Sequence, residues 1–267
     1  MKTIKELANL EGRCALITGA VGGIGSKMAE TIAELGGSLV LVDRPGTDYK
    51  PLLQALRNNW DVAFQCIDCD LEDEEQRKIL AARVRDEASR LDILINNAAF
   101  VGTSGLEGWV TNFERQSIAT WRRALEVNLT AAFELAQAFA PMLKQSGHGS
   151  IVNVASIYGI SGPDNSLYEG TAMGNPAAYA ASKGGLIQLT RWLATTLAPH
   201  IRVNSISPGG VFRNQAEKFV ERYVARTPMG RMASEDDFKG ATAFLASDLS
   251  AYVTGQNLLV DGGWTVW

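Results

Sequence analysis

The segment Thr18-Gly19-Ala20-Val21-Gly22-Gly23-Ile24-Gly25 decides the fold of this 267-residue chain. It follows the apolar run Cys14–Thr18, which predicts a strand, and it opens a segment of helical period over Gly23–Leu35. Glycines at such a junction let the turn tighten and let main-chain N–H groups approach a pyrophosphate, which the positive end of the helix dipole also attracts. The position of the turn therefore favours a dinucleotide-binding βαβ unit over an ordinary tight turn.

The next predicted strand, Ser38–Val42, is followed at once by Asp43, about twenty residues beyond the glycines. A carboxylate at this position can accept hydrogen bonds from both adenosine ribose hydroxyls. At about 4 Å and an effective dielectric of about 20, it would repel one charge on a 2′-phosphate by about 4 kcal/mol. No basic residue lies in the glycine turn, so we expect NAD, with NADP less favoured. Arg44 leaves binding of NADP as an alternative, since it could pair with a 2′-phosphate or stack on adenine.

Beyond this unit, β-branched apolar runs alternate with longer segments of helical period, which predicts a parallel sheet with crossover helices. The runs are almost continuously hydrophobic, which indicates that helices cover both faces. The remaining predicted strands are Val62–Ile67, Ile93–Asn96, Ser150–Val154, Arg202–Ile206 and Asn257–Val260. The remaining predicted helices are Tyr49–Asn58, Glu72–Ser89, Thr120–Lys144, Ala177–Leu197, Asn214–Tyr223 and Glu235–Leu245. We expect one α/β domain over residues 1–267, with a doubly wound, seven-stranded parallel sheet.

The composition narrows the class of partner. Hydrophobic residues make up 46% of the chain, and a net charge of −4 without a long basic run argues against nucleic acid or anionic membranes. Cys14, Cys66 and Cys69 give one CxxC without a second pair, so neither a metal site nor a disulfide framework is predicted. The chain opens without a signal-like segment and has no apolar run of about 18 residues, so we expect a cytoplasmic protein that acts on a small molecule.

Motifs along nearly the whole chain resemble those of the short-chain dehydrogenase/reductase family. They are the Thr18–Gly25 turn, Asp70-Leu71, Asn96-Asn97-Ala98-Ala99, Asn128, Ser156, Tyr179-Ala-Ala-Ser-Lys183, Pro208-Gly209-Gly210 and Asp261-Gly262-Gly263. The resemblance implies a Rossmann fold of strand order 3-2-1-4-5-6-7 and usually a homotetramer, with a homodimer as the alternative. The family assembles partly through the helix that carries Tyr179. Apolar residues on that helix suit either burial or an interface, namely Leu186, Leu189, Trp192 and Leu193.

The resemblance also implies which residues hold the cofactor. Asp70 and Leu71 would contact adenine, residues of the Asn97-Ala98 pair would line the cofactor path, and the segment after Pro208 would border the nicotinamide. With the turn and the second strand included, the expected cofactor-binding residues are Gly19, Gly23, Ile24, Gly25, Asp43, Arg44, Asp70, Leu71, Asn97, Ala98, Tyr179, Lys183, Pro208, Gly209 and Val211.

Tyr179 and Lys183 lie four residues apart, so one helical face presents both to the same cleft. A free phenol has a pKa of about 10 and is a poor base at neutral pH. A nearby ammonium would lower that pKa toward the working pH, and desolvation would oppose the change. Neither Tyr158 nor Tyr168 has a lysine at the same spacing. The pair is therefore the expected acid/base, and the family implies that Lys183 also binds the nicotinamide ribose.

Two further catalytic residues come from the resemblance. Asn128 would hold a water in the proton relay, and Ser156 would hydrogen-bond the substrate oxygen. The spacing from Ser156 to Tyr179 is longer than is usual in the family, whereas Ser166 lies at the customary distance. We still expect Ser156 to be the catalytic serine, because an insertion in a surface loop leaves the end of a strand in place.

The irregular stretches Phe100–Gln116 and Ile157–Asn175 both follow strand C-termini, where open α/β sheets bind ligands. The second contains an insertion, Gly162–Gly170, that resembles oxidoreductases of surface-sugar and flagellin-modification pathways. It carries side chains that could hydrogen-bond a polyhydroxylated ligand, namely Asp164, Asn165, Tyr168 and Glu169. The insertion could instead only shape a lid or a subunit contact.

The sequence thus predicts an NAD-dependent enzyme that interconverts a secondary alcohol and a ketone, on a sugar-like or other polar substrate. Two alternatives stay open at this point. One is a dehydratase or epimerase that recycles its NAD. The other is a catalytically idle scaffold that senses NAD, because a fold does not guarantee chemistry.

Overall fold

A seven-stranded sheet of order β3-β2-β1-β4-β5-β6-β7 forms the centre of the computed structural model, which describes residues 1–101 and 104–267. Every neighbouring pair of strands is parallel, and the order is the one that the resemblance implies. The strands are β1 (Cys14–Thr18), β2 (Ser38–Asp43), β3 (Phe64–Asp68), β4 (Ile93–Asn96), β5 (Gly149–Val154), β6 (Ile201–Pro208) and β7 (Asn257–Val260). The fold class expected from the sequence is confirmed.

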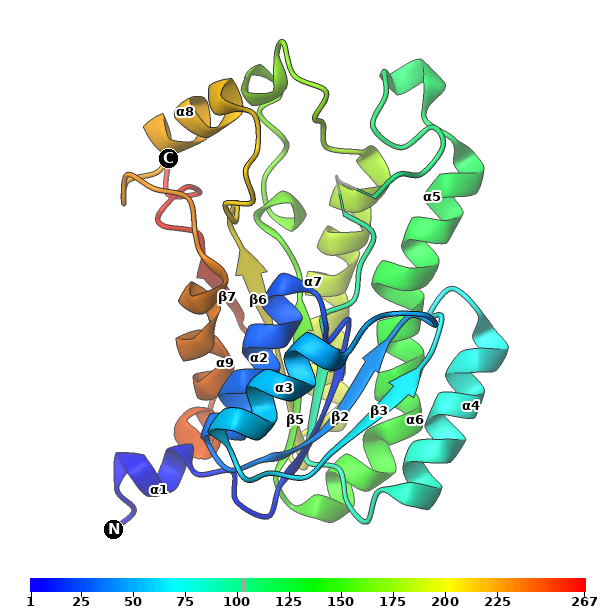
Figure 1. The fold of residues 1–267 in the computed structure, drawn as a ribbon, viewed down its shortest axis with the longest axis vertical. Coiled ribbons are helices and arrows are strands. Elements are labelled where there is room, and N and C mark those ends of the chain that lie inside the picture. The colour runs from blue at the N-terminus through cyan, green and yellow to red at the C-terminus, as the bar shows by residue number, and fades with distance from the viewer. Residues whose placement is uncertain (102–103) are drawn as a thin grey trace.

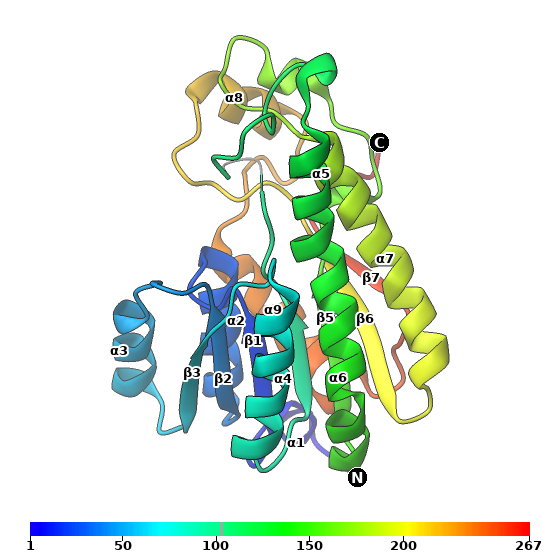
Figure 2. The same cartoon turned by 90° about the vertical axis from the view of Figure 1, so that its right-hand side faces the viewer.

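Helices cover both faces of the sheet, as Figures 1 and 2 show. On one face, Met28 and Ile32 pack with Ile17 in a buried cluster, and on the other, Leu16 and Phe139 belong to a second cluster. Burial on both faces explains why the strands are almost continuously apolar. The helices are α1 (Ile4–Ala8), α2 (Gly23–Glu34), α3 (Lys50–Asn59), α4 (Glu74–Glu87), α5 (Ile118–Leu125), α6 (Ala131–Ser146), α7 (Ala177–Leu197), α8 (Glu217–Ala225) and α9 (Lys239–Ala246).

Three predicted helices differ from the structure at places with a physical cause. The predicted helix Thr120–Lys144 is two helices, α5 and α6, joined by the π-helical turn η2 (Glu126–Thr130). The predicted helix from Asn214 begins only at Glu217, because Asn214 has a φ of 56°, which a right-handed helix excludes. The predicted helix from Glu235 starts as the 3₁₀ turn η5 (Glu235–Phe238) before α9. The short helix α1 was not predicted from the sequence.

The loops beyond the carboxyl ends of the strands, together with α8, rise above the sheet in Figure 2. The stretch 100–116 includes positions 102 and 103, which lie outside the described residues. The stretch 157–175 contains the 3₁₀ turns η3 (Ile157–Gly159) and η4 (Asn165–Tyr168). Within residues 1–101 and 104–267, no helix combines the length and the hydropathy that a bilayer crossing requires.

Two arginines, one in α8 and one directly after its last residue, hold the insertion against that helix. The Arg222 guanidinium donates to the carbonyl oxygens of three insertion residues, Ser166, Leu167 and Glu169. Arg226 forms an ion pair with Asp164. The insertion is therefore fixed by main-chain hydrogen bonds as well as by charge, and it forms one wall above the sheet.

Candidate active site

The glycine turn packs so closely against the loop after β4 that side chains are excluded. A Cβ on Gly19, which has a φ of +62°, would lie 2.9 Å from the Ala98 Cα, and one on Gly25 would lie 2.1 Å from the Gly19 carbonyl oxygen. The Asn97 side-chain amide donates to the carbonyl oxygens of Thr18 at 3.0 Å and Gly19 at 2.9 Å. These contacts fix the turn and explain why the sequence needs glycine there.

Main-chain donors face the opening that this turn creates. Helix α2 begins after Gly22, which offers no side chain to cap the first amides of a 12-residue helix. Asp43, at the end of β2, accepts a hydrogen bond from the Val21 amide at 2.9 Å through Oδ2 and thereby joins the second strand to the turn. The positive helix terminus beside a carboxylate-bearing strand end fits the pyrophosphate and adenosine ribose of a dinucleotide.

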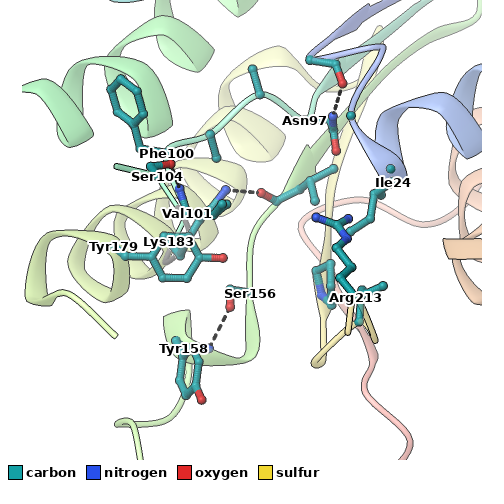
Figure 3. Close-up of a pocket in the computed structure, with 18 of the residues that line it drawn as sticks. Ile24, Asn97, Phe100, Val101, Ser104, Ser156, Tyr158, Tyr179, Lys183 and Arg213 are labelled. Atoms are coloured by element: carbon teal, nitrogen blue, oxygen red, sulfur yellow. Dashed lines mark hydrogen bonds between the residues drawn. The ribbon is translucent and has the colours of Figure 1, made fainter. Parts of the chain in front are cut away.

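A cavity of about 900 Å³ runs from this turn along the carboxyl edge of the sheet. Every cofactor-binding residue expected from the sequence lines it, and so do Ser156, Tyr179 and Lys183. Figure 3 shows Tyr179 and Lys183 on one side, Ser156 beneath them, and Ile24 of the glycine turn across the opening. The tertiary structure thus brings the cofactor and catalytic residues of six separate motifs to one cavity.

Ser156 and Lys183 are held by hydrogen bonds to the main chain around β5. The Ser156 Oγ accepts from the Tyr158 amide at 3.1 Å, and its own hydroxyl hydrogen is directed to Tyr179 or to a ligand. The Lys183 Nζ donates to the Val154 carbonyl oxygen at 2.6 Å and lies 5.9 Å from the centre of the Tyr179 ring. The acid/base pair therefore points into the cavity from α7 onto the end of β5.

The electrostatics of the pair differ from the sequence expectation. Burial raises the pKa of Tyr179, and a hydrogen bond with Ser156 opposes this only in part. Burial lowers the pKa of Lys183 to about 7. In the protein without cofactor, desolvation of both groups outweighs the expected acidification of the phenol, because the Lys183 amine is directed to the Val154 carbonyl.

Asn128 takes a different place from the other three predicted catalytic residues. It lies in the π-helical turn η2, is 2% exposed and does not line the large cavity. Its Oδ1 accepts from the Phe100 amide at 2.7 Å, and its Nδ2 donates to the Phe100 carbonyl and to the Ser182 hydroxyl. This geometry ties the loop after β4 to α7, and the relay role of Asn128 stays a prediction.

The alternative serine and most of the insertion lie outside the cavity. The Ser166 hydroxyl donates to Asp164 at 2.7 Å, and Ser166 does not line the cavity, whereas Ser156 does. Of the four insertion side chains expected to bind a polyhydroxylated ligand, only Tyr168 lines it. Asp164 is engaged by Arg226 and Ser166, because the insertion turns its acidic side chains toward α8 and solvent.

Sequence reasoning missed most of the cavity wall opposite the sheet. These residues come from the two irregular stretches and from the segment after Pro208, so only their position after strand C-termini could have indicated them. The residues are Phe100, Val101, Ser104, Leu106, Val110, Tyr158, Met173, Asn175, Arg213, Gln215, Phe219 and Tyr223. Arg213 is the charged member of this set, and its guanidinium lies at the glycine turn, where it pairs with Glu235 at 3.0 Å.

Comparison with known proteins shows which family the chain belongs to. Residues 19–265 match a family model described as Enoyl-(Acyl carrier protein) reductase. The chain is also 34% identical over 273 residues to galactitol 2-dehydrogenase (L-tagatose-forming) from Cereibacter sphaeroides, with 98% of this chain and 99% of that protein covered. The chain belongs to the short-chain dehydrogenase/reductase family.

Two solved structures of short-chain dehydrogenases extend the comparison to the fold. One, from Leptospira borgpetersenii serovar Hardjo-bovis with bound NAD+, is 35% identical, with a TM-score of 0.83 and 99% and 96% of the two chains covered. Another, gluconate 5-dehydrogenase from Burkholderia cenocepacia J2315 in complex with NADP and tartrate, is 29% identical, with a TM-score of 0.85 and 99% and 100% covered. The chain is an oxidoreductase of this family that acts on CH–OH groups, and both nicotinamide cofactors occur among its structural neighbours.

Proposed function

We propose that this chain is an NAD-dependent oxidoreductase that interconverts a secondary alcohol and a ketone. The observation that carries the proposal is the convergence of Ser156, Tyr179 and Lys183 on the cavity that the glycine turn opens. When bound, a nicotinamide dinucleotide would supply the hydride chemistry. The side chains of this chain supply the proton chemistry and the orientation of the substrate.

Each of the three residues has a distinct part in that chemistry. The Ser156 hydroxyl would donate to the substrate oxygen and orient it toward the Tyr179 hydroxyl. Tyr179 would take the proton from the alcohol in oxidation and return it to the carbonyl oxygen in reduction. Lys183, held by the Val154 carbonyl beneath the ring, would stabilise the phenolate and bind the cofactor ribose. Asn128 would act as a positioning residue, because it holds the main chain of Phe100 in the loop after β4.

The preference for NAD rests on Asp43. Its carboxylate borders the cavity at the end of β2, where the adenosine ribose of a dinucleotide on this fold is placed. A 2′-phosphate would approach that negative charge, whereas the two hydroxyls of NAD would donate to it. Arg44 lines the same end of the cavity, and in the proposed NAD complex its guanidinium would stack on adenine.

The test combines cofactor titration with two variants. NADH and NADPH binding would be followed by fluorescence, and turnover by absorbance with secondary alcohols and ketones. Tyr179→Phe should keep NADH affinity and lose turnover by at least about hundredfold, as removal of the acid/base does. Asp43→Asn should raise the ratio of NADPH to NADH affinity by at least about tenfold, because the repulsion disappears. Tighter NADPH than NADH binding by the wild type would refute the cofactor assignment, and full turnover by Tyr179→Phe would refute the mechanism.

Turnover itself separates the alternatives that the sequence left open. Net accumulation of NADH during alcohol oxidation supports the proposed dehydrogenase. A dehydratase or epimerase that recycles its NAD would convert substrate without such accumulation, and an NAD-sensing scaffold would bind NADH without turnover. The presence of Ser156, Tyr179 and Lys183 in the same cavity favours an enzyme over an idle scaffold, and NADH accumulation distinguishes the two enzymes.

We also propose a homotetramer, or a homodimer, assembled through α7. Leu186 and Leu193 are buried in this chain, and Leu189 packs against its core, so these three are not free to form an interface. Trp192 is 54% exposed on the same helix, which leaves its aromatic ring available to a second subunit. Sedimentation of the purified protein at micromolar concentration tests this, and a monomer would contradict it.

A further inference from the structure

We call the end of the cavity near the glycine turn, Asp43 and Asp70 the cofactor half, and the end near Tyr158, Tyr168 and Tyr223 the substrate half. The two halves differ in charge. Apart from Lys183, the charged side chains among the described lining residues are Asp43, Arg44, Asp70 and Arg213, and all belong to the cofactor end. Arg213 lies beside Ile24 in Figure 3, across the cavity from Tyr158 and Tyr179. Lys183 is 2% exposed and is engaged by the Val154 carbonyl. No arginine or lysine among the described lining residues is therefore placed to pair with an anionic substrate.

Aromatic and apolar side chains form the walls of this half. Tyr168, Phe219 and Tyr223 pack in sequence, with ring centres 5.4 Å and 5.8 Å apart. Val110 and Met173 line the same cavity from the two irregular stretches. Flat aromatic faces and aliphatic groups stabilise a ligand through its C–H surface, which a ring presents as a continuous face.

Tyr158 and Tyr168 place two hydroxyl groups in these otherwise apolar walls. The two oxygens lie 2.6 Å apart, and both residues line the cavity. Burial raises the pKa of both phenols, that of Tyr168 to about 12, so both carry their proton at neutral pH. One hydroxyl hydrogen is used between the two residues, which leaves one donor and several lone pairs for a ligand.

Asn175 is a third polar residue in this part of the cavity wall. It lines the cavity at the end of the irregular stretch 157–175. Its side-chain nitrogen is buried away from the cavity and has no hydrogen-bond partner among the described residues, so the amide does not itself reach a ligand. The tyrosine pair is separate from the Ser156 and Tyr179 hydroxyls, which would bind the reacting oxygen.

We propose that the substrate is an uncharged hydroxy or keto ring compound with a second oxygen, which the Tyr158–Tyr168 hydroxyl pair binds at a distance from the reacting carbon. The inference rests on the proposed function and narrows its substrate class. It keeps the hydroxylated character expected from the sequence and excludes substrates whose recognition depends on a carboxylate or a phosphate. A buried anion without a cationic partner would lose its hydration without compensation.

Three ketones with one ring skeleton test this. They are 4-(hydroxymethyl)cyclohexanone, 4-methylcyclohexanone and 4-oxocyclohexanecarboxylate, which share the ring and one substituent carbon and differ in the polar group on that carbon. Their affinities would be measured on the NADH complex of Tyr179→Phe, and their kcat/KM on the wild type with NADH. The hydroxymethyl compound should bind about tenfold more tightly than 4-methylcyclohexanone, as one hydrogen bond of about 1.4 kcal/mol allows. The carboxylate should bind at least about tenfold more weakly than the hydroxymethyl compound.

Variants connect the preference to the named residues. Tyr158→Phe and Tyr168→Phe should each reduce the ratio of hydroxymethyl to methyl ketone affinity to about one, whereas Tyr252→Phe, at a fully exposed tyrosine, should leave the ratio unchanged. Ala172→Lys puts an amine at an exposed position on the cavity wall and should raise carboxylate affinity by at least about tenfold.

The outcomes separate this inference from the proposed function. Carboxylate binding as tight as that of the hydroxymethyl compound would overturn the inference, and so would a ratio that survives in both phenylalanine variants or a failure of all three ketones to bind. The predicted order of affinities without any oxidation of NADH by the wild type would support the inference and refute the proposed hydride transfer instead.

Discussion

Lys183→Met should stabilise the cofactor-free protein at neutral pH, and by less as the pH rises. Burial lowers the pKa of Lys183 to about 7, whereas a lysine in the unfolded chain titrates at about 10.4. Between these two pKa values, lysine is protonated in the unfolded state and mostly neutral in the native state. This residue therefore destabilises the fold at every pH below the unfolded pKa. The cost is about 4 kcal/mol at pH 7 and about 2 kcal/mol at pH 9, and it disappears as the pH passes the unfolded value.

The slope with pH is the diagnostic quantity. The variant also loses the hydrogen bond to the Val154 carbonyl, which subtracts about 1 kcal/mol at every pH. Urea denaturation followed by tryptophan fluorescence at pH 7, 8 and 9 would give the free energy of unfolding of both proteins. The advantage of Lys183→Met should shrink by about 1 kcal/mol per pH unit over this range. Lys144→Met, at an exposed position of α6, serves as the control. A flat difference from pH 7 to pH 9 would refute the reasoning that the amine is buried at a cost.

Further variants probe the turn, the serine and the insertion. Gly25→Ala should weaken NADH binding by at least about tenfold, because its Cβ would lie 2.1 Å from a carbonyl oxygen of the turn, whereas Gly240→Ala in α9 meets no atom within 4 Å and should bind NADH normally. Ser156→Ala should lower kcat by about hundredfold, because the reacting oxygen loses a hydrogen-bond donor, whereas Ser166→Ala should leave kcat unchanged. The reverse result would assign the catalytic serine to the insertion. Arg222→Ala frees three carbonyl oxygens and should speed amide hydrogen exchange in residues 164–175 while the rest of the chain stays protected; unchanged exchange there would show that the insertion is held by other contacts.

Much of the fold follows from local patterns that a sequence displays directly. The strands β1, β4 and β7 and the helix α7 have the bounds that hydrophobic runs and helical period predict. The exceptions depend on single conformations that periodicity does not record. The π-helical turn that carries Asn128 has the same residue types as the helices around it, and the left-handed Asn214 is one residue in an otherwise helical pattern.

The sequence by itself determined the βαβ order, the glycine turn and the Tyr179–Lys183 spacing, because each depends on residues close together in the chain. Only the tertiary structure decided what surrounds them. It showed that Lys183 is buried, and that the insertion sends Asp164 to Arg226 and Tyr168 into the cavity. Desolvation and the direction of a loop side chain depend on segments far apart in sequence that pack together, and no local pattern specifies that packing.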